Sequence, residues 1–184
     1  KALKLNVHGS KPAIEKVFRV PENQADLVTL LHRSAMKFNQ AQIEKLIRKS
    51  ITDIGVEATW LEVLSPLLIE VGDEWVRTGD GIEVEHLLTE IIKNVMREKT
   101  NVTSQPVNTR PVLLASVGEE MHCLALHALA AALAEKKIET FFLGARTPLE
   151  AISGMVKRSA PPAVFLWAQL SQNSDSKFLT DLPT

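Results

Sequence analysis

The stretch "PVLLASVGEEMHCLALHALAAALAEKKIETFFLG", residues 111–144, places an alanine- and leucine-rich segment between two apolar runs. The runs at 111–117 and 138–144 predict buried strands, and the segment at 127–137 predicts a helix. A second helix at 147–159 and a third strand at 163–170 extend the pattern to βαβαβ. This alternation predicts a parallel sheet with right-handed crossovers, and such sheets bind ligands at the carboxyl ends of their strands.

The residues before this stretch follow a different period, with apolar side chains three and four positions apart. Asn39 suits the N-cap of a helix, Gly55 suits the position after a helix end, and Pro66 is expected to kink or restart a helix. Short connections favour a four-helix bundle. The predicted helices cover 25–38, 39–55, 59–76 and 82–98.

The change of period divides the chain into an α part followed by an α/β part. The segment between them is polar, contains Pro106 and has no periodicity, which is typical of a linker. The polar tail after residue 170 supplies no further core strand. The predicted segments are an N-terminal extension or linker at 1–22, the bundle at 23–99, the linker at 100–110 and the sheet domain at 111–184.

The composition argues against nucleic-acid binding, a disulfide and a membrane span. The 21 Lys and Arg residues against 22 Asp and Glu residues lack the basic excess of nucleic-acid binders, so the chain itself is not expected to grip DNA. Cys123 is the only cysteine, which excludes an intrachain disulfide. No apolar run reaches the ~18 residues of a membrane span. We therefore expect a cytoplasmic protein with no membrane partner.

The loop after the first predicted strand, "VGEEMHCLALH" at 117–127, carries a carboxylate two residues before an imidazole. A carboxylate such as Glu120 is the usual partner that fixes the tautomer of a metal-bound histidine, here His122. The alternative is a solvated loop histidine beside a surface glutamate. His127, inside the predicted helix, is expected to be an ordinary helix residue.

A second candidate group lies in "EWVRTGDGIEVEH", residues 74–86. Trp75 and the pair Glu85-His86 flank a glycine-bracketed turn, and Ile82 shares a helix face with His86 because the two are four residues apart. The alternatives are a packing tryptophan and a structural histidine. A zinc site is disfavoured because the chain has no C-x₂-C or HExxH spacing and its one cysteine cannot build a thiolate site.

Together, Trp75, nine residues, Glu85-His86 and then Glu120-x-His122 resemble the light-sensing half of the CarH/LitR cobalamin photoreceptors, relatives of the MerR regulators. The similarity runs from about Leu27 to Leu170. The stretch "FFLGARTPLEAI", residues 141–152, is similar to a loop and helix of cobalamin-binding domains and contains Gly144 and Thr147. The fold that this implies is a four-helix bundle followed by a Rossmann-like cobalamin-binding domain that is incomplete at its C-terminus.

The resemblance implies adenosylcobalamin held between the two domains, with the bundle as its upper cap. His122 would be the lower cobalt ligand with Glu120 as its partner, and Gly144 and Thr147 would also bind the cofactor. Trp75, Ile82, Glu85 and His86 would surround the adenosyl group. In the family, light breaks the cobalt–carbon bond, and His86 would then become the upper cobalt ligand.

These roles describe a sensory module of a transcriptional regulator and not an enzyme. Its DNA contact would come only through a MerR-type domain before Lys1, and its switch would act through a homo-oligomer or through domain arrangement. Two alternatives stay open. A corrinoid carrier of a methyltransferase has the same bundle and sheet domain and the same lower histidine. Trp75 and Glu85-His86 disfavour it, because a carrier needs an exposed upper face. A relative that has lost cobalamin is favoured by Ala125, which stands where the family has glycine.

Overall fold

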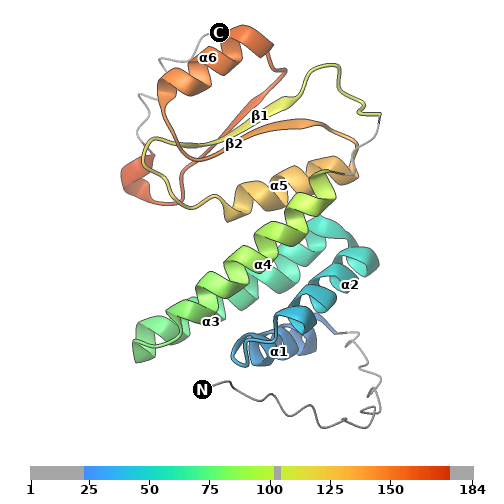
Figure 1. Ribbon diagram of the computed structural model, residues 1–184, viewed down its shortest axis with the longest axis vertical. Coiled ribbons are helices and arrows are strands. Elements are labelled where there is room, and N and C mark those ends of the chain that lie inside the picture. Colours follow the sequence, from blue (N-terminus) through green and yellow to red (C-terminus); the bar gives the residue numbers. More distant parts are fainter. Residues whose placement is uncertain (1–22, 102–104, 175–184) are drawn as a thin grey trace, which may run out of the picture.

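The computed structural model describes residues 23–101 and 105–174, so the predicted extension at 1–22 lies outside the described residues. A helical bundle is followed by a small sheet domain, as predicted (Figure 1). The bundle elements are α1 (Gln24–Ala35), α2 (Gln40–Thr59), the π-helix η1 (Trp60–Leu64), α3 (Ser65–Thr78) and α4 (Ile82–Thr100).

Local signals place the boundaries inside the bundle. The side chain of Asn39 accepts a hydrogen bond from the Gln42 N–H at 3.2 Å and caps α2. Gly55 interrupts α2 with φ +84°, which only glycine adopts without strain. The N–H of Val56, where the helix resumes, donates to both carboxylate oxygens of Glu135 at 3.1 and 3.0 Å. This contact ties the bundle to the sheet domain.

The third predicted helix is divided into η1 and α3. Pro66 stands in the first turn of α3, where its missing N–H and fixed φ are tolerated. The wider π turn lies directly before it, so the expected kink or restart is present. Gly79, at φ +78°, ends α3 in the left-handed conformation.

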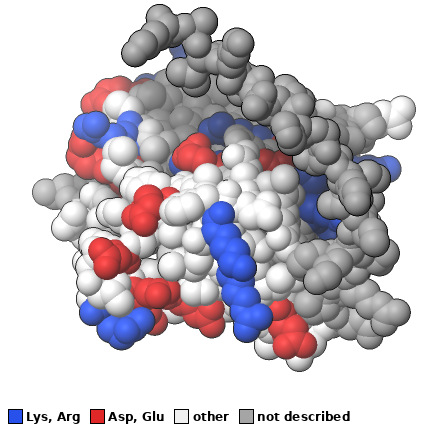
Figure 2. All heavy atoms as spheres, turned by 60° about the horizontal axis from the view of Figure 1, so that its bottom comes forward, with Lys and Arg blue, Asp and Glu red and all other residues white. Residues whose placement is uncertain are grey.

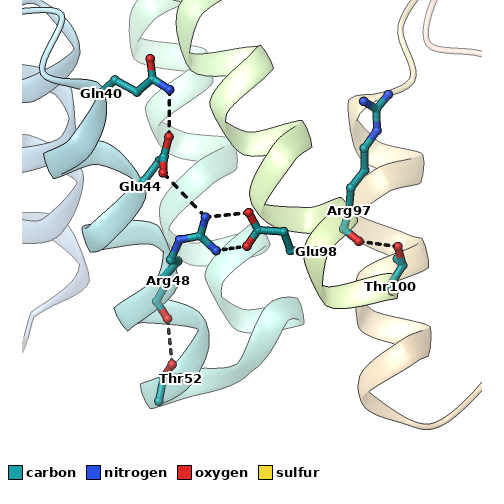
Figure 3. A network of polar contacts seen from close by, with 7 residues as sticks. All are labelled: Gln40, Glu44, Arg48, Thr52, Arg97, Glu98 and Thr100. Atoms are coloured by element: carbon teal, nitrogen blue, oxygen red, sulfur yellow. Dashed lines mark hydrogen bonds and ion pairs between the residues drawn. The ribbon is translucent and has the colours of Figure 1, made fainter. Parts of the chain in front are cut away.

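Apolar packing and not surface charge holds the bundle together. Its core includes the fully buried Leu31, Ile47 and Leu88, and Ala131 from α5 packs into the same cluster. Arg48 links α2 to α4 through a two-pronged ion pair with Glu98 (Figure 3). Exposed pairs of this kind contribute about 0–1 kcal/mol, less than one buried leucine side chain.

The sheet consists of β1 (Val112–Val117), β2 (Thr140–Thr147) and β3 (Val164–Trp167), all parallel, in the order β2-β1-β3. The connecting helices are α5 (Leu124–Glu135) and α6 (Leu149–Ser159). Because β2 and β3 lie on opposite sides of β1, right-handed crossovers place the two helices on opposite faces. Figure 1 shows α6 on the outer face and α5 between the sheet and the bundle.

Burial of the sheet on both faces explains the continuous apolar run of β1. Leu113, Ala115 and Val117 pack in one cluster with Ile152 of α6. Leu114 points the other way and packs with Leu126 of α5. A central parallel strand therefore has no polar face.

Several boundaries differ from the prediction. Helix α5 begins at Leu124 and not at residue 127, and β2 runs from Thr140 to Thr147 instead of from 138 to 144. Strand β3 ends at Trp167 and not at residue 170, because the N–H groups of Gln169 and Leu170 bind Glu120 instead of a neighbouring strand. Helix α4 reaches Thr100, one residue into the predicted linker.

The described surface agrees with the balanced composition. On the face that Figure 2 shows, acidic and basic side chains are scattered among uncharged residues and gather into no basic patch. Within 23–101 and 105–174, no helix has both the length and the apolarity needed to cross a membrane.

Candidate functional site

The loop between β1 and α5 is organised around one buried carboxylate. The side chain of Glu120 is fully buried and accepts five hydrogen bonds. Two come from His122, through its backbone N–H at 2.9 Å and its ring Nδ1 at 2.5 Å. The other donors lie after β3, namely the N–H groups of Gln169 and Leu170 and the side-chain amide of Asn173, at 2.9, 3.0 and 3.0 Å.

These donors keep the carboxyl group ionised. Burial raises the pKa of Glu120, but the hydrogen bonds from Leu170, Asn173 and His122 outweigh it and hold the pKa at about 2. At neutral pH the side chain is therefore a carboxylate, which can only accept hydrogen bonds.

The ionised carboxylate decides the state of the His122 ring. Because Glu120 can only accept, the ring atom Nδ1 donates, and the neutral imidazole has its lone pair on Nε2. The side chain of His122 is 47% exposed. Its backbone carbonyl accepts a hydrogen bond from the Ser116 hydroxyl at 3.2 Å, which fixes the loop to β1. His122 thus presents an oriented Nε2 at the carboxyl end of the sheet.

The predicted residues Gly144 and Thr147 lie at the irregular end of β2, beside this loop. The β1–β2 register shifts twice there, and Gly144 has φ +85°. The buried Thr147 donates from its hydroxyl to the Gly144 carbonyl at 3.1 Å, and its own carbonyl accepts from Gly118 at 3.2 Å. The Arg146 N–H also donates to the Glu120 carbonyl at 2.9 Å. The end of β2 therefore holds the Glu120 loop in place.

The second predicted group lies at the turn between α3 and α4. Trp75 and Ile82 are 41% and 46% exposed, although both are large apolar residues. His86 is exposed and Glu85 is half-buried one turn into α4. Figure 1 shows this turn on the same side of the molecule as the carboxyl ends of the strands. Within the described residues, no hydrogen bond or ion pair joins these four residues to the Glu120 loop.

An apolar surface that the prediction missed runs along η1 and α3. Leu61, Ile69 and Val76 are 60%, 63% and 77% exposed and follow one another at helical spacing. Their spacing was visible in the sequence as an apolar stripe beyond the core-facing one.

This surface leads into a cavity of about 400 Å³ between the two domains. Its walls come from η1, α5 and β3, and they include Leu61, Ala125 and Trp167. The indole Nε1 of Trp167 is buried without a hydrogen-bond partner in the part of the chain that the structure describes. A buried donor without an acceptor costs about 1–3 kcal/mol.

Metal ligation here would rest on very few side chains. The described residues contain no cluster of three or more His, Cys, Asp or Glu side chains that could hold an ion. A metal at His122 would therefore have to arrive with most of its own ligands, which is how cobalt arrives in a corrin ring. The donor set fits a single axial ligand.

Comparison with known families adds an independent finding for the bundle. Residues 27–98 match the family model described as "B12 binding domain". The helical half is similar to B12 binding domains. The matched segment runs from α1 into α4 and includes Trp75, Ile82, Glu85 and His86, but it ends before the Glu120 loop. The match supports a cobalamin-type cofactor, and it does not distinguish a sensor from a corrinoid carrier. None of the curated proteins matches the chain.

Proposed function

We propose that this chain binds adenosylcobalamin between its bundle and its sheet domain, and that it is the light-responsive sensory module of a transcriptional regulator. The observation that carries the proposal is the His122 ring, whose Nδ1 is held by the buried Glu120 carboxylate at 2.5 Å while no described residue makes a hydrogen bond to Nε2. The match of residues 27–98 to the B12 binding domain model supports the same cofactor from the other half of the chain.

The proposed cofactor contacts come from both domains. His122 would ligate cobalt from the sheet side, and Glu120 would accept from Nδ1–H, which fixes the ring orientation and leaves Nε2 to face the metal. Trp75 and Ile82 would pack against the adenosyl group. Their exposure without a ligand supports this role, because side chains that only served the core would be buried.

Adenosylcobalamin supplies a cobalt–carbon bond that light can break. Without the adenosyl group, Trp75 and Ile82 would lose a packing partner, and the α3–α4 turn would be free to move toward the sheet. His86, on the same helix face as Ile82, would follow this movement and occupy the upper ligand position. A change in domain arrangement, and through it in oligomer contacts, would carry the signal.

A corrinoid carrier is the second candidate. The match of residues 27–98 to the B12 binding domain model supports a carrier as well as a sensor. In a carrier, His86 would have no role as an upper ligand.

One experiment tests the proposal. The chain is loaded with adenosylcobalamin, and absorption spectra are recorded in the dark and after green light for the wild type and for His86→Ala. We expect equal dark spectra, and after light a bis-histidine spectrum in the wild type only. Identical illuminated spectra in both proteins would reject the sensor mechanism and favour the carrier, and failure of the wild type to retain cobalamin would reject both.

A further inference from the structure

A second cavity lies at the opposite edge of the sheet from the Glu120 loop. Its volume is about 340 Å³, and its walls come from the end of α4, the middle of α5 and the start of β2. The walls include Arg97, Asn101, His127 and Phe142. Because it lies near the amino end of β2, this cavity is separate from the proposed cobalamin site.

His127 is an unpartnered polar group in the wall of this cavity. Its side chain is only 5% exposed, and its ring stacks on Phe142 with 4.3 Å between the ring centroids. No hydrogen bond to either ring nitrogen exists within the described residues. A ligand in the cavity would give this ring a hydrogen bond that the described residues do not supply.

The charges around this ring favour an anion. Burial, followed by the positive charges of Arg97 and Lys93, lowers the pKa of His127 to about 4, and Glu90 opposes this only weakly. Lys93 is already paired with Glu90 at 2.7 Å. Arg97 has no ion pair within the described residues, and Figure 3 shows its side chain extending away from the Arg48–Glu98 contact.

We propose that this cavity binds a small oxyanion, a phosphate or a carboxylate group, with Arg97 and His127 as its main contacts. Arg97 donates charge-assisted hydrogen bonds from its planar guanidinium, and Asn101 adds an amide donor at the same end of α4. A bound anion also favours the protonated ring of His127, which then donates to it. Glu139 lines the cavity as well, and its negative charge weakens the binding.

The test follows the His127 ring directly in the full chain without cobalamin, so its outcome is independent of the proposed function. The chain has five histidines, and the ring cross-peak of His127 is assigned by its loss in His127→Gln. Inorganic phosphate and formate are titrated separately at pH 6.5, with chloride holding the ionic strength constant. We expect a saturable shift of this cross-peak, and the anion that binds more tightly identifies the preferred group.

Three variants that each remove one charge test whether the charges at the cavity set the affinity for the anion. Arg97→Gln should weaken binding by about tenfold or more, because it removes a charge-assisted contact. Glu139→Gln should strengthen it, and Arg33→Gln, which removes an exposed arginine of α1, should leave it unchanged. The proposal is overturned if neither anion gives a saturable shift, or if Arg97→Gln binds as tightly as Arg33→Gln.

Discussion

Replacing Glu120 by glutamine tests whether the buried carboxylate organises the candidate site. The substitution preserves the shape of the side chain but exchanges one acceptor oxygen for an NH₂ donor. One carboxylate oxygen of Glu120 receives the two donors of His122, and the other receives the donors of Gln169, Leu170 and Asn173. In either orientation, the new NH₂ group faces at least two donors.

The expected loss of stability follows from this count. Each buried donor left without an acceptor costs about 1–3 kcal/mol. Because the side chain is fully buried, water cannot replace the lost acceptor without a rearrangement of the loop. The free energy of unfolding should therefore fall by about 2–6 kcal/mol for two donors.

Glu119→Gln is the matched control. Glu119 is the neighbouring residue, and its carboxylate is exposed and paired only with Arg146, which is also exposed. Loss of a surface pair of this kind should cost about 0–1 kcal/mol. Both variants therefore replace glutamate by glutamine, one at a buried position and the other at an exposed one.

The assay is urea unfolding at pH 7, followed by tryptophan fluorescence and by circular dichroism. Coincident transitions from the two probes would justify a two-state fit. If Glu120→Gln is destabilised no more than Glu119→Gln, then the five hydrogen bonds do not hold the loop as the structure indicates. The reasoning about the His122 tautomer would fail with them.

Three further predictions concern other residues. His122→Ala should lose most of its bound cobalamin on gel filtration, whereas His127→Gln should retain it; equal retention would remove His122 as the lower ligand. Trp75→Ala should weaken adenosylcobalamin binding more than hydroxocobalamin binding and change the free energy of unfolding by less than about 1 kcal/mol, because the ring is 41% exposed; equal losses for both cofactor forms would make Trp75 a structural residue. For His127, the folded-state pKa of about 4 lies below the ordinary histidine pKa of 6.5. As the pH falls from 6.5 to 4, the unfolded chain binds a proton at this histidine before the folded chain does. The free energy of unfolding should therefore be unaffected above about pH 6.5 and fall by up to about 3 kcal/mol by pH 4. His127→Phe should not show this loss. If urea unfolding of His127→Phe has the same pH dependence as that of the wild type, the prediction is wrong.

The prediction of the elements succeeded where the signal was local. The apolar period, the Asn39 cap and the break at Gly55 each depend on residues within a few positions of one another. The end of β3 was predicted too late, because Gln169 and Leu170 are apolar or neutral enough to continue a strand. Their N–H groups instead bind a carboxylate about 50 residues earlier in the chain.

The candidate site was predictable only in part, for the same reason. The Glu120–His122 pair could be expected because the two residues are adjacent in the loop, and the structure brings them together. Asn173 was missed because it reaches Glu120 only when the segment after β3 folds against the β1–α5 loop. Trp167 and Leu61 were missed because the cavity that they line forms only where α5, β3 and η1 meet in space. The roles of Trp75, Ile82, Glu85 and His86 stay predictions.

The sequence by itself determined which residues form helices and strands, which residues end them, and that a carboxylate stands beside an imidazole in a loop. These properties follow from spacing along the chain, because backbone conformation and neighbouring side chains act over short distances. Only the tertiary structure decided that Glu120 is buried among five donors and stays ionised, and that Arg97 and His127 line one cavity. These properties depend on desolvation and on contacts between segments far apart in sequence, so they exist only once the sheet and the bundle have packed around them.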